Sequence, residues 1–234
     1  MSQLSTRGYL LRHRRAPSPI VFPVEAEVPE GKRHLRLRTF LFQLLEFALG
    51  QESSIGSEQF VYWNARDPRR CLAPDVFVRL GVPDSTFDTW KTWERGGAPE
   101  LAVEIVSRSD APDEPWDDKL ERYHELGVRE LVRFDPKAPE GARIRVWDRV
   151  QEDLVEREVE GDSTPSTTLR LYWVVAPIEG LEVGLRLAED VEGTKLLLSR
   201  TETEAQARQA EAQARQAAEA RVAALEAELR RRGG

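Results

Sequence analysis

The segment 99–136, PELAVEIVSRSDAPDEPWDDKLERYHELGVRELVRFDP, constrains the fold of this chain more than any other. Its apolar run predicts a buried strand at 99–107, a helix at 115–126 and a second strand at 130–134, which Asp135-Pro136 ends. Glu104 stands in the middle of the first strand. Because burial of an unpaired carboxylate is costly, Glu104 needs a partner or a function.

The predicted helix has recognisable end signals. Pro115 suits its first turn, Asp113 or Glu114 can cap it, and Gly127 suits its end. The apolar face comprises Trp116, Leu120, Tyr123 and Leu126.

The side chains of this helix divide into core and polar positions. We interpret Trp116 and Tyr123 as core residues, with a contact of the Tyr123 hydroxyl to a polar site as the alternative. Asp117 and Asp118 are typical of a solvated helix start, where negative charge favours the helix dipole. Lys119 lies beside the apolar face.

A second acidic residue, Asp75, stands at the mouth of the apolar run at 74–80. Two carboxylates at corresponding depths of adjacent strands can hold Mg²⁺, and a nearby lysine can stabilise a phosphate. The pattern is therefore compatible with a metal site formed by Asp75, Glu104 and Lys119. The alternative is a buried Glu104–Lys119 ion pair that binds no metal.

Periodicity predicts the other elements. Apolar residues at helical spacing, followed by Gly50, predict a helix at 31–49. We interpret His34, a single histidine in its first turn, as structural or solvent-facing rather than as a ligand. A loop is expected at 161–167, and a short helix near 87–93 within a long loop at 81–98. Strands are expected at 58–64, 74–80, 142–149, 153–159, 168–176 and 181–188, with 142–149 and 153–159 paired as a hairpin.

Composition changes at both ends of the chain. Residues 1–24 form a basic, proline-interrupted arm, expected to be flexible, with phosphate contact as the alternative. Residues 25–198 are expected to form one domain. In 199–234 the heptad EAQARQA occurs twice and predicts a helix at 201–231, roughly 46 Å long. Alanine makes the apolar seam of this helix weak, so a coiled coil is expected only if the core also forms a homodimer, and a solitary surface helix is the alternative.

The overall composition bounds the location and class of the protein. With 234 residues, 40% of them apolar, the chain can bury one sizeable core. Cys71 is the single cysteine, which excludes an intrachain disulfide and fits a reducing compartment. No apolar run approaches the length of a membrane span, so we expect a cytoplasmic protein. Zinc-ligand spacing, a GxxxxGK[ST] phosphate loop and a GxSxG motif are all missing from the sequence.

Charge is distributed unevenly. Residues 1–38 carry a net charge of +5, whereas 39–200 hold 20 Lys/Arg against 32 Asp/Glu, a net charge of −12. An acidic middle argues against a broad nucleic-acid-binding face, because phosphates are neutralised by Lys and Arg. It remains compatible with a metal site, which uses carboxylates.

Three segments resemble the Uma-type family of putative restriction endonucleases, within the PD-(D/E)xK nuclease superfamily. The segments are 73–80 (APDVFVRL), 100–107 (ELAVEIVS) and 117–136 (DDKLERYHELGVRELVRFDP). The resemblance covers roughly 25–190. It implies an α/β, restriction-endonuclease-like mixed sheet flanked by helices, and a Mg²⁺- or Mn²⁺-dependent endonuclease that acts on DNA.

The resemblance also implies roles for individual residues. Asp75 matches the motif aspartate and Glu104 the motif glutamate, so both are expected to hold the metal. The superfamily places its lysine two residues after the glutamate, where this chain has Val106. In the Uma-type family the lysine comes from the following helix, which is Lys119 here and is expected to position the attacking water.

Two departures accompany these matches. Pro115 stands where family members often have an aspartate, and 130–132 reads ELV where they usually read EYW. The superfamily often adds a glutamate near the first helix, for which Glu30 and then Glu25 are the candidates. The second hypothesis is a catalytically silent binding or assembly module of the same fold, which associates through its C-terminal helix.

Overall fold

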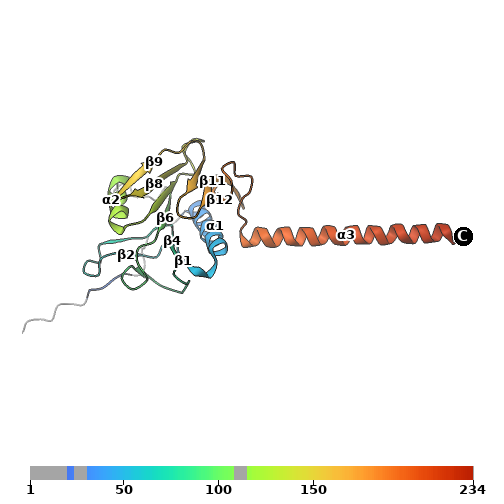
Figure 1. Ribbon diagram of the computed structural model, residues 1–234, viewed down its shortest axis with the longest axis horizontal. Helices are drawn as coiled ribbons and strands as arrows, with labels where there is room; N and C mark the ends of the chain where they lie inside the picture. Colours follow the sequence, from blue (N-terminus) through green and yellow to red (C-terminus); the bar gives the residue numbers. More distant parts are fainter. Residues whose placement is uncertain (1–19, 24–30, 108–114, 234) are drawn as a thin grey trace, which may run out of the picture.

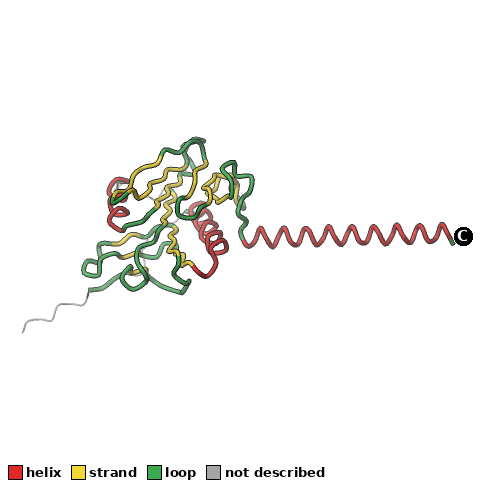
Figure 2. Tube along the Cα trace, in the orientation of Figure 1, coloured by secondary structure: helices red, strands yellow, loops and turns green. Residues whose placement is uncertain are grey.

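The computed structural model describes residues 20–23, 31–107 and 115–233. Most of the basic arm, the helix-capping candidates Asp113 and Glu114, and the candidates Glu25 and Glu30 lie outside these ranges. Within them the molecule has a layered α/β body, from which one long helix extends (Figures 1 and 2).

A mixed six-stranded sheet forms the centre of the body. Its strand order is β1-β4-β6-β7-β8-β9, and only the β6–β7 pair is parallel. Helix α2 makes the crossover between these two strands, so the predicted strand–helix–strand unit and the mixed α/β sheet are confirmed. The bounds are β1 (Ser53–Gly56), β4 (Val76–Leu80), β6 (Leu101–Ile105), α2 (Trp116–Leu126), β7 (Glu130–Phe134), β8 (Ile144–Val150) and β9 (Asp153–Arg157).

The central sheet has a different cover on each face. Helix α1 (Lys32–Leu49) packs on one face through buried Leu37, Leu41, Leu44 and Leu45, and Gly50 follows its last residue, as predicted. Helix α2 packs on the opposite face, together with the small sheet β3-β2-β5. Because side chains alternate along a strand, Val103 and Ile105 of β6 face α1, whereas Ala102 and Glu104 face α2.

The small sheet corrects the prediction for 81–98. Its strands are β2 (Val61–Tyr62), β3 (Cys71–Leu72) and β5 (Trp90–Lys91), and β5 pairs in parallel with β2. The short helix expected near 87–93 was therefore wrong. Trp90 is fully buried against the rings of Phe77 and Phe87, so its tertiary contacts, rather than local propensity, decide the conformation. The strand expected at 58–64 is only two residues long.

A second three-stranded sheet covers the α1 face and corrects the loop expected at 161–167. It consists of β10 (Ser163–Ser166), β11 (Leu171–Ile178) and β12 (Leu181–Ala188), all antiparallel. The composition of GDSTPST suggested a loop. Thr164 and Ser166 are nevertheless buried in β10, where they form hydrogen bonds with Arg157 and Glu130 of the central sheet. Strand β1 had no prediction at all.

Helix α3 (Arg200–Arg232) starts at a well-defined cap and then leaves the body (Figure 1). Ser199 and Glu202 form a reciprocal capping box, and Arg186 of β12 donates to both oxygens of Glu202 at 2.9 and 2.8 Å. The predicted helix at 201–231 is confirmed, and none of its residues is buried. Among the described residues, no helix is long and apolar enough to cross a membrane.

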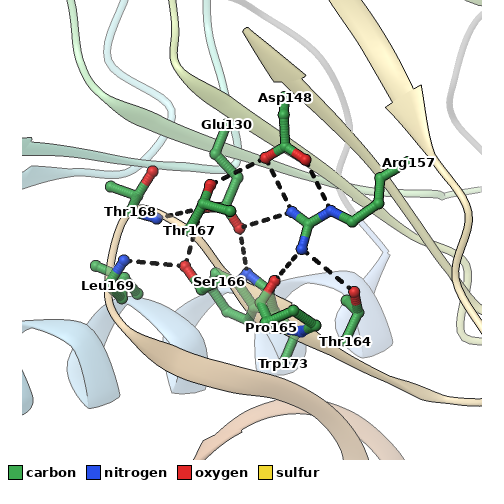
Figure 3. A network of polar contacts seen from close by, with 10 residues as sticks. All are labelled: Glu130, Asp148, Arg157, Thr164, Pro165, Ser166, Thr167, Thr168, Leu169 and Trp173. Atoms are coloured by element: carbon green, nitrogen blue, oxygen red, sulfur yellow. Dashed lines mark hydrogen bonds and ion pairs between the residues drawn. The ribbon is translucent and has the colours of Figure 1, made fainter. Parts of the chain in front are cut away.

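A buried polar network joins the central sheet to the sheet formed by β10, β11 and β12 (Figure 3). The side chain of Glu130 in β7 has no exposed surface and accepts hydrogen bonds from Ser166 Oγ at 2.9 Å, Thr168 N at 2.8 Å and Trp173 Nε1 at 2.9 Å. Arg157 lies 3.9 Å from the same carboxylate and pairs with Asp148 at 2.7 Å. Because Ser166, Thr168 and Trp173 all donate to the Glu130 carboxylate, the polar strand β10 can pack against the central sheet with these donors satisfied.

We predict that Glu130→Ala lowers the free energy of unfolding by about 3–5 kcal/mol, because it leaves buried donors without their acceptor. The matched control is Glu156→Ala, which removes an ion pair with Arg145 in which both side chains are nearly half exposed. That loss should stay below about 1 kcal/mol. Urea unfolding measures both values, and equal losses for the two variants would contradict the structural role of the network.

Candidate active site

Glu104 is positioned by its strand and bound by one helix. Its side chain points from β6 to α2, where Lys119 Nζ lies 2.7 Å from Oε2 and the Tyr123 hydroxyl donates to Oε1. Lys119 and Tyr123 stand four residues apart, so they lie one above the other on the same helix face. Tyr123 is thus both a core residue and a contact of the site, which combines the two interpretations of it.

Asp75 lies beside Glu104 at the end of the neighbouring strand. In the antiparallel β4–β6 pair Val76 faces Val103, so the next residues outward are Asp75 and Glu104. The backbone N–H of Ile105 donates to Asp75 Oδ2 at 2.6 Å, so the carboxylate continues the strand ladder. The structure therefore brings together Asp75, Glu104 and Lys119, which are spread over 45 positions of the sequence.

Burial controls the electrostatics of the site. Removal from water raises the pKa of Glu104 above its ordinary value, and the nearby Asp75 raises it further, while Lys119 and Tyr123 act in the opposite direction. Burial and the Glu104 carboxylate hold the pKa of Tyr123 well above its usual value, so its hydroxyl remains a donor. Lys119 keeps a quarter of its side chain exposed, whereas Glu104 is almost entirely buried.

Two further residues adjoin Asp75. His34 Nε2, from the first turn of α1, lies 2.6 Å from Asp75 Oδ1, so His34 faces the site rather than solvent. Glu58 follows β1 and completes a group with His34 and Asp75 in which one ligand atom of each residue lies within 4.8 Å of the others. Sequence reasoning gave His34 a structural role and did not consider Glu58. The early position of His34 in the first helix of the resembling segment was the available signal, and Glu58 offered none.

An open cavity of about 530 Å³ adjoins this group. Its walls come from the first turns of α1, including His34, from Val106 and Ser107 after β6, and from Pro136 and Lys137 after β7. Lys32 and Arg33 of α1 also line the cavity. Together with Lys137 they give it three basic side chains. His34 is the residue that connects this cavity with the carboxylate group.

The donor set fits a divalent cation. Asp75, Glu58 and Glu104 supply carboxylate oxygens, which Mg²⁺ and Mn²⁺ accept, and His34 supplies an imidazole nitrogen. All four side chains except that of Glu58 are largely buried, so their positions are fixed by packing and hydrogen bonds. A divalent cation held by these residues could neutralise the charge of a phosphate and activate water.

The raised pKa of Glu104 predicts a pH dependence of stability. The folded state holds the proton of Glu104 more tightly than the unfolded chain, so this residue lowers the free energy of unfolding as pH rises from the unfolded pKa through the raised one. Glu104→Gln lacks this titration. In chelator-containing buffer its stability relative to the wild type should therefore increase with pH across that window. A difference that is independent of pH, or that decreases, would contradict the assignment.

Comparisons with known proteins place the chain in a family. A crystal structure of a putative nuclease belonging to DUF820 from Anabaena variabilis ATCC 29413 matches with 14% sequence identity and a TM-score of 0.44, over 61% of this chain and 75% of that one. No functionally curated protein matches the chain. The profile of the Uma2 family, described as putative restriction endonuclease, matches residues 24–183. Since this match spans more than half of the sequence, the chain belongs to the Uma2 family of putative restriction endonucleases.

Proposed function

We propose that this protein is a metal-dependent endonuclease that hydrolyses phosphodiester bonds of DNA. The observation that carries the proposal is the convergence of Asp75, Glu104 and Lys119 at one end of the central sheet. Membership of a nuclease family makes phosphodiester hydrolysis the reaction to which such a site is best matched. A cytoplasmic location is part of the proposal, because Cys71 is the single cysteine of the chain.

Each residue has a distinct role in the proposed reaction. Asp75 and Glu104 would hold Mg²⁺ or Mn²⁺, which when bound neutralises phosphate charge and activates water. Lys119 carries the ammonium closest to Glu104 and would orient the attacking water or stabilise charge on the phosphate. Tyr123 is a positioning residue, because its hydroxyl fixes the second oxygen of Glu104 and turns the carboxylate toward Lys119.

The charge around the cavity supports a polyanionic substrate. Lys32, Arg33 and Lys137 line the opening beside the site, while the region 39–200 as a whole is acidic. Phosphates would therefore be attracted to this opening more than to the rest of the body. The favourable charge is local, so the proposal limits DNA contact to the face that carries the cavity.

One observation favours the second function, an assembly module without activity. The Glu104 carboxylate is already bound by Lys119 and Tyr123, as expected for a satisfied buried ion pair. In this alternative the acids serve the fold, and α3 provides the binding surface. Metal binding and cleavage discriminate between the two functions, because only the enzyme requires both.

We propose that α3 pairs with α3 of a second copy of the chain, whether the protein is an endonuclease or an assembly module. Val222, Leu225 and Leu229 are exposed on the part of the helix that leaves the body. Because long helices gain most of their stability from packing, a partner helix with the same heptads would cover these residues. Light scattering should show a dimer that Leu225→Glu with Leu229→Glu converts to a monomer, and a monomeric wild type would contradict this pairing.

Plasmid and single-stranded DNA cleavage, with Mg²⁺ and with Mn²⁺, tests the proposed function. Lys119→Ala should reduce the rate on the order of 10²-fold or more, as loss of one charge-stabilising donor does in other enzymes. The matched control is Lys91→Ala, which removes a lysine paired with Glu94 outside the site and should retain wild-type activity. Circular dichroism checks that both variants are folded.

Two results would count against the proposal. Equal cleavage by the wild type and Lys119→Ala would remove Lys119 from the mechanism. A wild type that binds no Mn²⁺ and cleaves neither substrate would favour the assembly module.

A further inference from the structure

We propose that His34, Glu58 and Asp75 form a cation position on the α1 side of the site that takes Mn²⁺ in preference to Mg²⁺. The inference rests on the proposed function for the role of the metal. To the two carboxylates of the proposed site, Asp75 and Glu104, it adds the nitrogen ligand of His34 and a third carboxylate, Glu58. Glu104 is not a ligand of this cation position, because its two oxygens are held by Lys119 and Tyr123.

The geometry of the three residues suits one ion. Their ligand atoms lie within 4.8 Å of one another, and His34 Nε2 and Asp75 Oδ1 are 2.6 Å apart. Ligands on opposite sides of a small divalent ion are separated by about 4 Å, twice a bond length of about 2.1 Å. An ion bound here would replace the hydrogen bond between His34 Nε2 and Asp75 Oδ1, because adjacent ligands of one ion stand about 3 Å apart.

The surrounding bonds hold the three residues in place from three separate elements. Ser57 Oγ donates to the carbonyl oxygen of Asp75 at 2.8 Å, and Glu58 N donates to the carbonyl oxygen of Pro74 at 2.9 Å. Arg38 of α1 donates to Ser57 Oγ at 2.9 Å and lies 3.2 Å from the Glu58 carboxylate. This supporting shell fixes the turn after β1 against both α1 and the start of β4.

The same residues leave an entry path for the ion. Asp75 and His34 are nearly buried, at 10% and 12% side-chain exposure, whereas Glu58 is 46% exposed. His34 also forms part of the wall of the 530 Å³ cavity. Glu58, which is paired with Arg38, is therefore the ligand of the three that solvent reaches most easily.

The donor types determine the metal preference. Mg²⁺ prefers oxygen ligands and gives up its water reluctantly, so an imidazole nitrogen is a poor ligand for it. Imidazole suits transition metals, and carboxylates suit Mn²⁺ as well as Mg²⁺. A set of one imidazole and two carboxylates thus favours Mn²⁺ over Mg²⁺ when both are present.

Mn²⁺ binding to the full chain without DNA tests this inference. Electron paramagnetic resonance reports free Mn²⁺ during a titration, and competition with Mg²⁺ gives the relative affinity of the two ions. His34→Asn and Glu58→Gln should each weaken Mn²⁺ binding at least about 10-fold, since loss of even an outer partner costs that much. His34→Asn should also lower the ratio of Mn²⁺ to Mg²⁺ affinity, because it replaces nitrogen by oxygen.

The chain offers a matched control. His124 lies 3.3 Å from Asp153, and neither residue belongs to the group of His34, Glu58 and Asp75, so His124→Asn removes a histidine beside an aspartate outside that group. This variant should bind Mn²⁺ like the wild type. Thermal unfolding of every variant verifies that a loss of binding is not a loss of fold.

The outcomes separate this inference from the proposed function. Mn²⁺ binding that is unchanged in His34→Asn and Glu58→Gln but lost in Glu104→Gln would overturn the inference and leave the proposed function standing. Intact Mn²⁺ binding through His34 and Glu58, with no DNA cleavage, would overturn the proposed function and leave the inference standing. Absence of Mn²⁺ binding to the wild type would overturn the inference and remove the metal from the proposed reaction.

Discussion

The buried carboxylate of Glu104 is the constraint on which the arrangement of the site depends. A charge in the middle of a sheet strand must be met by donors on the face to which it points. Helix α2 supplies them, with Lys119 and Tyr123 one turn apart. The crossover from β6 to β7 thus both completes the parallel pair and places Lys119 beside Glu104.

The two buried glutamates of neighbouring strands show what distinguishes a structural acid from the candidate site. Glu130 has no exposed surface and accepts bonds from hydroxyl, indole and backbone donors of the second sheet, so its surroundings are closed. Glu104 instead lies close to Asp75. It is also bound by Lys119, whose side chain is partly exposed to solvent. The first arrangement serves packing. The second keeps a charged group accessible, as a reacting site requires.

Local patterns were sufficient for the elements that the site uses. Helical spacing in α1 and α2, the apolar run of β6 and the alternation in β8 and β9 determine those elements within a few residues. The residue pattern suggested that Asp75, Glu104 and Lys119 form one site, and the resemblance assigned roles to them, but their actual contacts depend on strand pairing, which is not visible in one sequence. Strand β5, strand β10 and the residue Glu58 escaped prediction because distant partners decide them: the rings around Trp90, the acceptor Glu130, and the contacts between the turn after β1 and the start of β4. The contact of His34 with Asp75, 41 positions away, was not visible in the sequence for the same reason.

We infer that the end of the sheet at Asp75 binds a divalent cation. Crystals grown with Mn²⁺ would show this, because anomalous scattering locates the ion without any assumption about activity. An anomalous peak is expected within bonding distance of an Asp75 oxygen, and it should be absent from crystals of Asp75→Asn. Mn²⁺-containing crystals with no peak at Asp75, or with peaks only elsewhere on the surface, would contradict it.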